Sequence, residues 1–326
     1  MLEPSLRNEL IELIAANFNP DEMDELGTLL FSEYDSHNLI GESSHVTLSR
    51  RRAAKLLVEH AAEKDKIKDL VKLVAELDNG IFRGRRRLID GIENYFYNLA
   101  KIGIIYNSQK RKLYFSKEEI NKMKNWGTLR NGRIYPVSIM SVDIVDNSGL
   151  VRKYRSRKME KMYFGLWNFL ERKLNEYEGR MWNWAGDGGI LAFALKGHQE
   201  RAVKCAVDIQ RSLALFNISS ENPIPEFISL RIGIDTGMIK FFLETGKIVS
   251  DVINYAAHLE KKAATPGNVA VSERVASELD PKIVSIFKNC GDFEGTDYFA
   301  TTERLDTLFV NPENGCVSPI SEVAEY

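Results

Sequence analysis

The sequence contains little cysteine, and its three cysteines, Cys205, Cys290 and Cys316, are far apart with no Cys-x-x-Cys pair. We therefore expect neither a disulfide framework nor a cysteine zinc site. Long apolar runs are also absent, because no stretch approaches the length needed to span a membrane. The N-terminal segment 1–18 is charged and periodic, unlike a signal peptide. These absences predict a cytoplasmic protein with no membrane partner.

An excess of charge of one sign is lacking as well. The 44 Lys and Arg residues nearly balance the 46 Asp and Glu residues, so the formal net charge is -2. This balance gives no general case for nucleic-acid or membrane-surface binding. Hydrophobic residues make up 44% of the 326 residues, and the chain is long enough for two domains. We expect a globular protein that does not bind nucleic acid directly.

Residues 1–80 carry helical periodicity throughout. Apolar residues recur three and four positions apart after Ser5, after Pro20 and after Ser49, and again within 65–77. Ser5 and Ser49 are candidate helix caps. The pattern predicts an all-helical N-terminal domain. In length and pattern it resembles the death-like or effector-associated adaptor domains of bacterial defence proteins, which implies a regulatory role.

Residues 81–133 predict a connector or a second regulatory element. Their pattern indicates a helix, a short strand pair and another helix. The basic cluster at 83–87 reads more simply as a solvated linker than as a contact for an anion. Which role the segment 81–133 has stays open.

From residue 134 the pattern changes to alternating strands and helices, which predicts an α/β (α+β) domain over 134–326. The expected elements are, in order, a strand at 135–145, a helix at 151–179, a hairpin at 180–194, a helix at 198–217, a strand at 228–237 with a partner at 238–244, a helix at 250–264, a strand at 268–272 and a helix at 273–279. This order predicts a mixed sheet with helices on one face.

Two acidic residues stand out in this domain. Asp143 ends a buried apolar run, and Asp187 lies at the tip of the turn "AGDGG" between two apolar runs. An Asp-Gly turn is by itself common and structural. The first strand and the hairpin are expected to be neighbours, however, so the two carboxylates could converge at one end of the sheet. Such a pair, without His or Cys nearby, suits Mg²⁺ or Mn²⁺, which usually work with phosphates.

Four runs, "VSIMSVDIVDNSG", "WNWAGDGGILAF", "LRIGIDTG" and "VSDVINYAAHLEKKAATPGNVAVSERV", occur in that order. Together they resemble the class III nucleotidyl cyclase catalytic domain over roughly residues 134–310. The resemblance implies that Asp143, Asp187 and the carbonyl of Ile144 bind two ions of Mn²⁺ or Mg²⁺. The implied reaction is attack of a ribose 3′-hydroxyl on the α-phosphate of a nucleoside triphosphate, with release of pyrophosphate.

The resemblance also implies substrate contacts and an assembly. Asn147 and Ser148 occupy the loop where family members bind the triphosphate, and Asn254 matches the catalytic asparagine that orients the ribose. In the family the aspartates come from one protomer and the asparagine from the other. We therefore expect a homodimer whose active sites form across the interface.

Five positions depart from the family pattern. Asn183 stands where adenylate cyclases place a lysine that reads the base, Lys247 stands at the second base-reading position, and Ser141 replaces a phenylalanine. His258 takes the place of a transition-state arginine, and Glu294 is the candidate at the place of a triphosphate-binding lysine. The simpler alternatives are a surface role for Lys247, a packed or surface role for His258 and a space-filling role for Ser141.

The metal-binding positions are thus retained while the purine-reading positions are not. This combination resembles the pyrimidine cyclases of bacterial Pycsar antiphage defence. It implies conversion of UTP to cyclic UMP, a second messenger that activates a companion effector, with Asn183 at the base edge. Trp182 and Trp184 could stack on the base, although a place in the strand core is the simpler role for at least one of them. Cytidylate cyclase activity, adenylate or guanylate cyclase activity and a catalytically dead nucleotide-binding domain remain alternatives. The choice between UTP and CTP and the activating trigger stay open.

Overall fold

The computed structural model of the chain describes residues 2–41, 47–107 and 110–307. The chain divides into two compact units, Met1–Arg130 and Asn131–Tyr326, and each has its own hydrophobic core. Within the described residues, no helix is long and apolar enough to cross a bilayer. Cys316 and the end of the predicted domain 134–326 lie outside the described residues.

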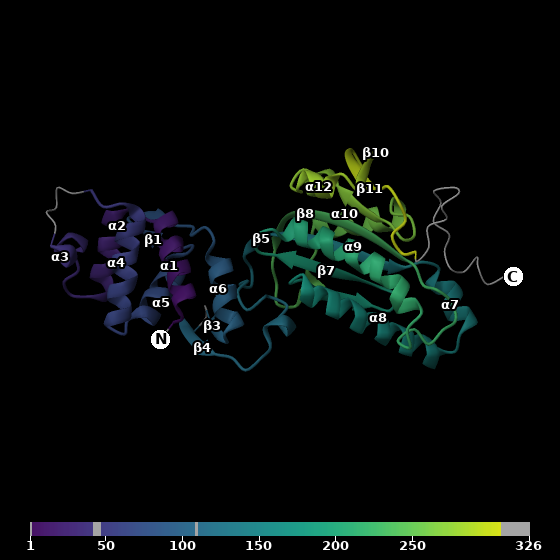
Figure 1. Cartoon of the computed structure of the whole chain (residues 1–326), viewed down its shortest axis with the longest axis horizontal. Coiled ribbons are helices and arrows are strands. Elements are labelled where there is room, and N and C mark those ends of the chain that lie inside the picture. Colours follow the sequence, from purple (N-terminus) through teal and green to yellow (C-terminus); the bar gives the residue numbers. More distant parts are fainter. Residues whose placement is uncertain (1, 42–46, 108–109, 308–326) are drawn as a thin grey trace. The chain divides into compact units, whose positions relative to one another are not determined.

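The first unit is a helical bundle with two small hairpins (Figure 1, purple to blue). Its elements are α1 (Pro4–Asn17), α2 (Pro20–Leu30), α3 (Ser36–Ile40), α4 (Arg50–Glu63), α5 (Ile67–Leu77), β1 (Ile81–Phe82), β2 (Arg85–Arg86), α6 (Ile92–Lys101), β3 (Ile104–Asn107), β4 (Lys112–Phe115) and the 3₁₀ turn η1 (Ile120–Lys122). Leu10 of α1, Leu70 of α5 and Phe96 of α6 belong to one core. Part of the segment 81–133 therefore packs with residues 1–80, and the division of the two by role stays a prediction.

Local chemistry explains where these helices begin. Ser49 accepts a hydrogen bond from the backbone N–H of Arg52 at 3.3 Å, so its predicted role as the cap of α4 is confirmed. The predicted cap at Ser5 is wrong, because α1 already begins at Pro4. Proline suits the first helical position, since its fixed φ matches the helix and its missing N–H would be unpaired there anyway.

The basic cluster 83–87 is bound by carboxylates of α2. Arg83 pairs with Glu25 at 2.5 Å, and Arg87 pairs with Glu22 at 2.8 Å. These arginines therefore tie the segment around the β1–β2 hairpin to the bundle.

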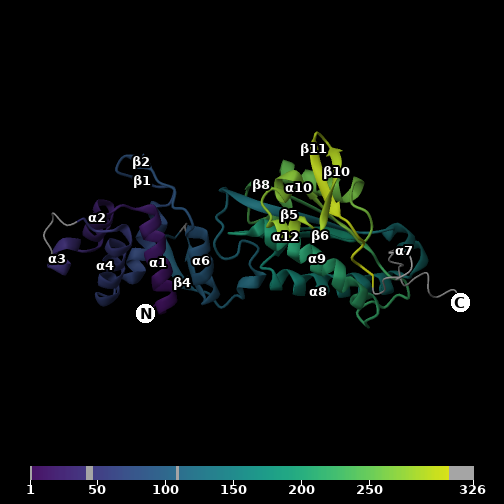
Figure 2. The same ribbon diagram turned by 45° about the horizontal axis from the view of Figure 1, so that its top comes forward.

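The second unit holds a sheet between layers of helices (Figures 1 and 2). Its elements are β5 (Ile134–Ile144), α7 (Asn147–Lys153), α8 (Ser156–Glu176), β6 (Arg180–Ala185), β7 (Gly188–Ala194), α9 (His198–Asn217), β8 (Leu230–Lys240), the 3₁₀ turn η2 (Thr245–Lys247), α10 (Asp251–Lys262), β9 (Val269–Ser272), α11 (Glu273–Ala276), α12 (Pro281–Val284), β10 (Phe287–Phe293) and β11 (Thr296–Thr301). Over the described residues the strand order is β10-β11-β9-β8-β5-β7-β6, with β8 and β9 parallel and the other neighbours antiparallel. The predicted α+β class with a mixed sheet is confirmed.

Helices cover both faces of this sheet. The helices α8 and α9 pack against inward residues such as Val142 and Ile232. The helix α10 lies on the opposite face, because a Cβ atom at Gly233 would come 2.4 Å from its backbone at Ala256 O and at Glu260 N. The expectation that helices cover one face is therefore wrong.

Two predicted elements differ from the structure. The strand β8 runs unbroken through Gly237, so the separate partner strand at 238–244 is wrong. The single helix expected at 151–179 is also wrong, because the chain is extended at Tyr154 between α7 and α8. The hairpin of β10 and β11 was not among the expected elements.

Candidate active site

The two aspartates Asp143 and Asp187 lie at the same end of the sheet. Asp143 is the next-to-last residue of β5 and pairs in register with Gly188 of β7, the residue that follows Asp187. The N–H of Ile144 donates to the carbonyl oxygen of Asp187 at 3.1 Å. The structure therefore brings together the backbone positions of Asp143, Ile144 and Asp187, as the pattern of strand and hairpin predicted.

Glycines shape the turn that carries Asp187. Ala185 pairs with Gly188, so the loop between β6 and β7 consists of Gly186 and Asp187. Gly186 has a φ of +67°, which suits glycine at the first position of a two-residue hairpin loop. A Cβ atom at Gly188 would lie 2.7 Å from the carbonyl oxygen of Val142 and 3.1 Å from Oδ1 of Asp143. The absence of a side chain at Gly188 therefore keeps the two strands and the carboxylate of Asp143 together.

A hydrogen-bonded chain holds the carboxylate of Asp187. Asn147 Nδ2 donates to Asp187 Oδ2 at 3.0 Å, and the hydroxyl of Tyr163 donates to Asn147 Oδ1 at 2.6 Å. Burial raises the pKa of Tyr163, so its hydroxyl keeps its proton. The side chain of Asn147 is thus committed to orienting Asp187. Ser148 follows it at the start of α7.

The carboxylate of Asp143 is paired with an arginine that the sequence analysis missed. Arg231 Nη2 of β8 donates to Asp143 Oδ2 at 2.5 Å, and Arg231 Nε lies 3.1 Å from Glu260 Oε1 of α10. Burial, followed by the negative charge of Asp143, raises the pKa of Glu260 to about 7. Arg231 thus offsets negative charge between two acidic groups.

Two predicted substrate-binding residues, Ser141 and Asn183, share a face with Asp143. Ser141 of β5 pairs with Ile190 of β7, which pairs with Asn183 of β6, and directly paired residues point to the same face. Asn183 is exposed, whereas Ser141 is buried with 5% of its surface accessible. Asn183 is therefore open to a ligand on this face, and Ser141 lies beneath the surface.

Trp182 and Trp184 differ in their surroundings. The strand β6 has an irregularity between Met181 and Asn183, and Trp182 there is buried against Phe241, with ring centroids 5.8 Å apart. Its carbonyl also accepts a hydrogen bond from Thr245 at 2.6 Å. Stacking of Trp182 on a base would require it to leave the core, so that candidate is wrong. Trp184 is half-buried and donates its indole N–H to the carbonyl of Gly186 at 3.1 Å, which supports the turn.

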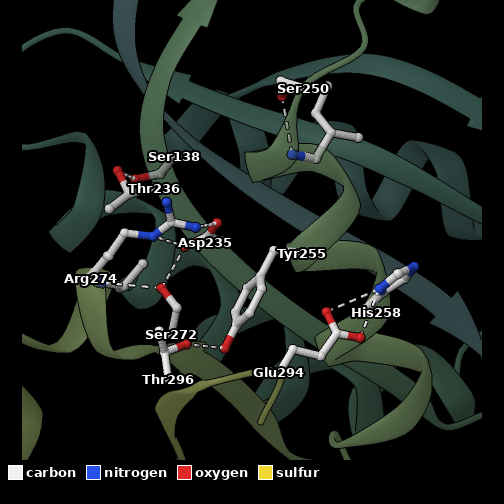
Figure 3. A network of polar contacts seen from close by, with 12 residues as sticks. Ser138, Asp235, Thr236, Ser250, Tyr255, His258, Ser272, Arg274, Glu294 and Thr296 are labelled. Atoms are coloured by element: carbon white, nitrogen blue, oxygen red, sulfur yellow. Dashed lines mark hydrogen bonds and ion pairs between the residues drawn. The ribbon is translucent and has the colours of Figure 1, made fainter.

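The other predicted site residues lie on or before α10. Lys247 is exposed and pairs with Glu244 at 2.5 Å. Asn254 is exposed in the first half of α10, whose N-cap is Ser250. His258, one turn further on, is exposed and contacts Glu294 (Figure 3). Among the described residues, no hydrogen bond or ion pair joins Asn254 or His258 to either aspartate.

The donor set at the end of the sheet fits a hard divalent cation. Two carboxylates and a nearby backbone carbonyl are the oxygen ligands that Mg²⁺ and Mn²⁺ prefer, and Gly188 lets β7 pack closely against the carboxylate of Asp143. Elsewhere among the described residues, Asp24, Asp35 and His37 also lie close enough to share an ion. There Asp24 accepts from Ser36 and Asp35 caps α3, so local turn formation accounts for that cluster.

With this geometry established, comparison with known proteins identifies the family. The model of the adenylate and guanylate cyclase catalytic domain matches residues 129–294, which is half of the chain. The chain therefore belongs to this family, whose class III members are nucleotidyl cyclases that use divalent metal ions. No curated protein matches the chain.

Several solved cyclase structures are similar in outline. The guanylate cyclase domain of RhGC from Catenaria anguillulae, crystallised with GTP, is 17% identical, with 53% of this chain and 99% of that chain covered and a TM-score of 0.45. The adenylyl cyclase CyaB from P. aeruginosa is 16% identical, with 52% and 95% covered and a TM-score of 0.46. At these identities and scores, the likenesses assign no substrate to this chain.

Proposed function

We propose that this chain is a metal-dependent pyrimidine cyclase that converts UTP to 3′,5′-cyclic UMP and pyrophosphate as a homodimer. The observation that carries the proposal is the pairing of Asp143 with Gly188, the residue after Asp187, which sets both aspartates at the same end of the sheet. Family membership supports the cyclisation reaction. The departures at the base-reading positions support a pyrimidine.

The residues for the metal site would be Asp143, Asp187 and the carbonyl of Ile144, with two ions of Mn²⁺ or Mg²⁺. Such ions stabilise a deprotonated 3′-hydroxyl and offset charge on the leaving phosphates. Asn147 orients Asp187 through its side chain. The backbone N–H groups of Asn147 and Ser148 would bind the triphosphate, as the resemblance implies. Arg231 offers its positive charge to phosphate once a cation shares Asp143.

Asn183 and Lys247 would read the base. Asn183 is exposed on the face shared with Asp143, and its amide has both a donor and an acceptor, as a uracil or cytosine edge requires. Ser141 would line the floor of the pocket. UTP is preferred here because of the resemblance to the Pycsar cyclases, which also implies that the product activates a companion effector during phage infection.

The exposed positions of Asn254 and His258 on α10 support a site shared between protomers. A second copy of the chain would bring its Asn254 to the ribose and its His258 to the phosphates. Each dimer would then hold two sites, each with aspartates from one protomer and the asparagine from the other.

Product formation from each of the four nucleoside triphosphates tests the proposal. Purified full-length protein with Mn²⁺ should release cyclic UMP and pyrophosphate from UTP, and Asp187→Asn should lower this rate to roughly 1% or less. Asp292→Asn is the matched control, because Asp292 is an exposed carboxylate on the β10–β11 hairpin. Preference for CTP or a purine would refute the uridylate assignment, and equal inactivity on all four would refute the cyclase.

Mixing two inactive variants tests the shared site. Asp187→Asn and Asn254→Ala should each be inactive alone. After random exchange of protomers, about half of the dimers are mixed and each has one intact site, so roughly a quarter of the wild-type rate should return. No recovery from dimers that have demonstrably exchanged would contradict a site built from two protomers.

A further inference from the structure

The exposed side of α10 carries a row of hydrogen-bond donors. Asn254, His258 and Lys262 follow one another at intervals of four residues, so they lie along one side of the helix. All three are exposed, whereas Ala256 and Leu259 on the other side are fully buried. An amide, an imidazole and an ammonium group in a row suit an extended anion such as a phosphate chain.

One carboxylate reaches this row from a distant part of the chain. Glu294 lies 3.0 Å and 3.2 Å from Nδ1 of His258 through its two oxygens, and 3.3 Å from Nζ of Lys262. Figure 3 shows that the other ring nitrogen of His258, Nε2, points away from Glu294. The contact therefore fixes the ring by one nitrogen and leaves the other free to meet a ligand.

The backbone at Glu294 adopts a conformation that glutamate disfavours. Phe293 pairs with Thr296, so Glu294 and Gly295 form a two-residue hairpin loop with φ values of +53° and +89°. Asn or Asp followed by Gly is the usual choice for such a loop. A glutamate held at positive φ points to a use for its longer side chain.

The helix α10 holds this hairpin on both sides of Glu294. The hydroxyl of Tyr255 donates to the carbonyl of Phe293 at 3.1 Å and lies 2.9 Å from Oγ1 of Thr296. The guanidinium of Arg274 lies 5.7 Å from the centre of the Tyr255 ring, and Arg274 is itself paired with the buried Asp235 at 2.5 Å. Figure 3 shows this network leading from the sheet to the tip of the hairpin.

We propose that Glu294 is a positioning residue that fixes the imidazole ring of His258 through Nδ1, so that Nε2 faces a phosphate group of the substrate. The inference rests on the proposed cyclase function. The charged groups beside the imidazole are Glu294 from the hairpin and Lys262 on α10, which offsets part of the charge of Glu294. Held in this orientation, His258 acts on the charge that builds up on the phosphates in the transition state.

Glu294→Gln tests the proposal, because the amide oxygen can still accept the hydrogen bond but carries no charge. We expect kcat for cyclic product to fall about tenfold, with KM within about twofold, because a neutral amide holds the ring less firmly than a carboxylate does. The control Asp292→Asn removes the same charge from the same hairpin and keeps the acceptor for the N–H of Gly295, so it should match the wild type. If Glu294 only repelled phosphate, Glu294→Gln would leave kcat unchanged or raise it.

The same substitution in a His258→Arg background provides the second test. The guanidinium of arginine presents several donors in a fixed plane and does not need a carboxylate to orient it, so in a His258→Arg background Glu294→Gln should change kcat less than about twofold. Equal effects of Glu294→Gln in both backgrounds, or wild-type kcat in the Glu294→Gln variant, would overturn the inference while leaving the cyclase proposal intact. Wild-type protein that forms no cyclic product overturns both. Tyr255→Phe loosens the hairpin and leaves the side chains of Glu294 and His258 unchanged. It should also lower kcat, but less than Glu294→Gln does.

Discussion

Acidification is expected to destabilise the second unit through one buried histidine. His198 begins α9 with 5% of its surface exposed, and its Nδ1 lies 2.9 Å from the buried hydroxyl of Ser138 in β5. Burial lowers the pKa of His198 from 6.5 to about 4, and the positive charge of Arg201 acts in the same direction. The folded unit therefore holds the neutral imidazole, also because a helix N-terminus disfavours a cation.

The pKa values determine the size and sign of the effect. Between pH 6.5 and pH 4 the unfolded chain binds a proton at His198 that the folded unit does not bind. The free energy of unfolding must therefore fall as the pH falls through this window, by up to about 1.4 kcal/mol per pH unit. Between pH 8 and pH 5 the contribution of His198 amounts to about 2 kcal/mol.

Urea denaturation of the full-length protein at pH 8 and at pH 5, followed by tryptophan fluorescence, measures this contribution. Carboxylates also titrate over this range, so the informative quantity is the difference between wild type and His198→Gln. The glutamine does not titrate and can still bond to Ser138. The variant should lose about 2 kcal/mol less than the wild type.

The losses of unfolding free energy in wild type and in His198→Gln test this reasoning. Equal losses in both proteins would refute the reasoning, because they would mean that folded His198 takes up its proton without cost. His37→Gln is a suitable comparison variant, since His37 lies in the first unit and His198 in the second.

Two glycine substitutions test the packing around the site. Gly233→Ala should lower the free energy of unfolding by about 2–3 kcal/mol in urea denaturation, because the new Cβ would meet backbone atoms of α10 at 2.4 Å. A loss below about 0.5 kcal/mol would contradict this and show that α10 can move away. Gly188→Ala should lower cyclase activity about 100-fold, because a Cβ there displaces either the strand at Val142 or the carboxylate of Asp143. Unchanged kcat in Gly188→Ala would contradict the placement of the metal site.

The adjacency of Asp143 and Asp187 could be predicted from the sequence because it depends on local rules. An apolar strand and a neighbouring hairpin have few ways to pair, and the glycines around Asp187 identify the two-residue loop. Arg231 was missed, although strand alternation in "LRIGIDTG" places Arg231 and Gly233 on one face of the sheet and Ile232 on the other. The missing information was the position of β8 beside β5, which pairs Arg231 with Asp143.

Glycine in β8 shows why other elements could not be predicted. Gly237 follows an apolar strand and reads as a turn, yet the strand continues through it. Its small size serves tertiary packing, because a Cβ atom there would lie 2.8 Å from the side chain of Val252 in α10. A sequence pattern cannot separate these two uses of glycine, since both depend only on the absence of a side chain.

The positions that depart from the family pattern have to be interpreted in pairs. Taken singly, His258 and Glu294 each read as the loss of a cation, and two such losses favour a catalytically dead domain. The structure places Nδ1 of His258 and Oε1 of Glu294 3.0 Å apart, although 36 residues separate the two in the chain. A carboxylate that contacts Nδ1 orients the ring, so the glutamate supports the histidine at position 258 instead of adding a second loss. The two changes therefore weigh less against catalysis together than they do when counted separately.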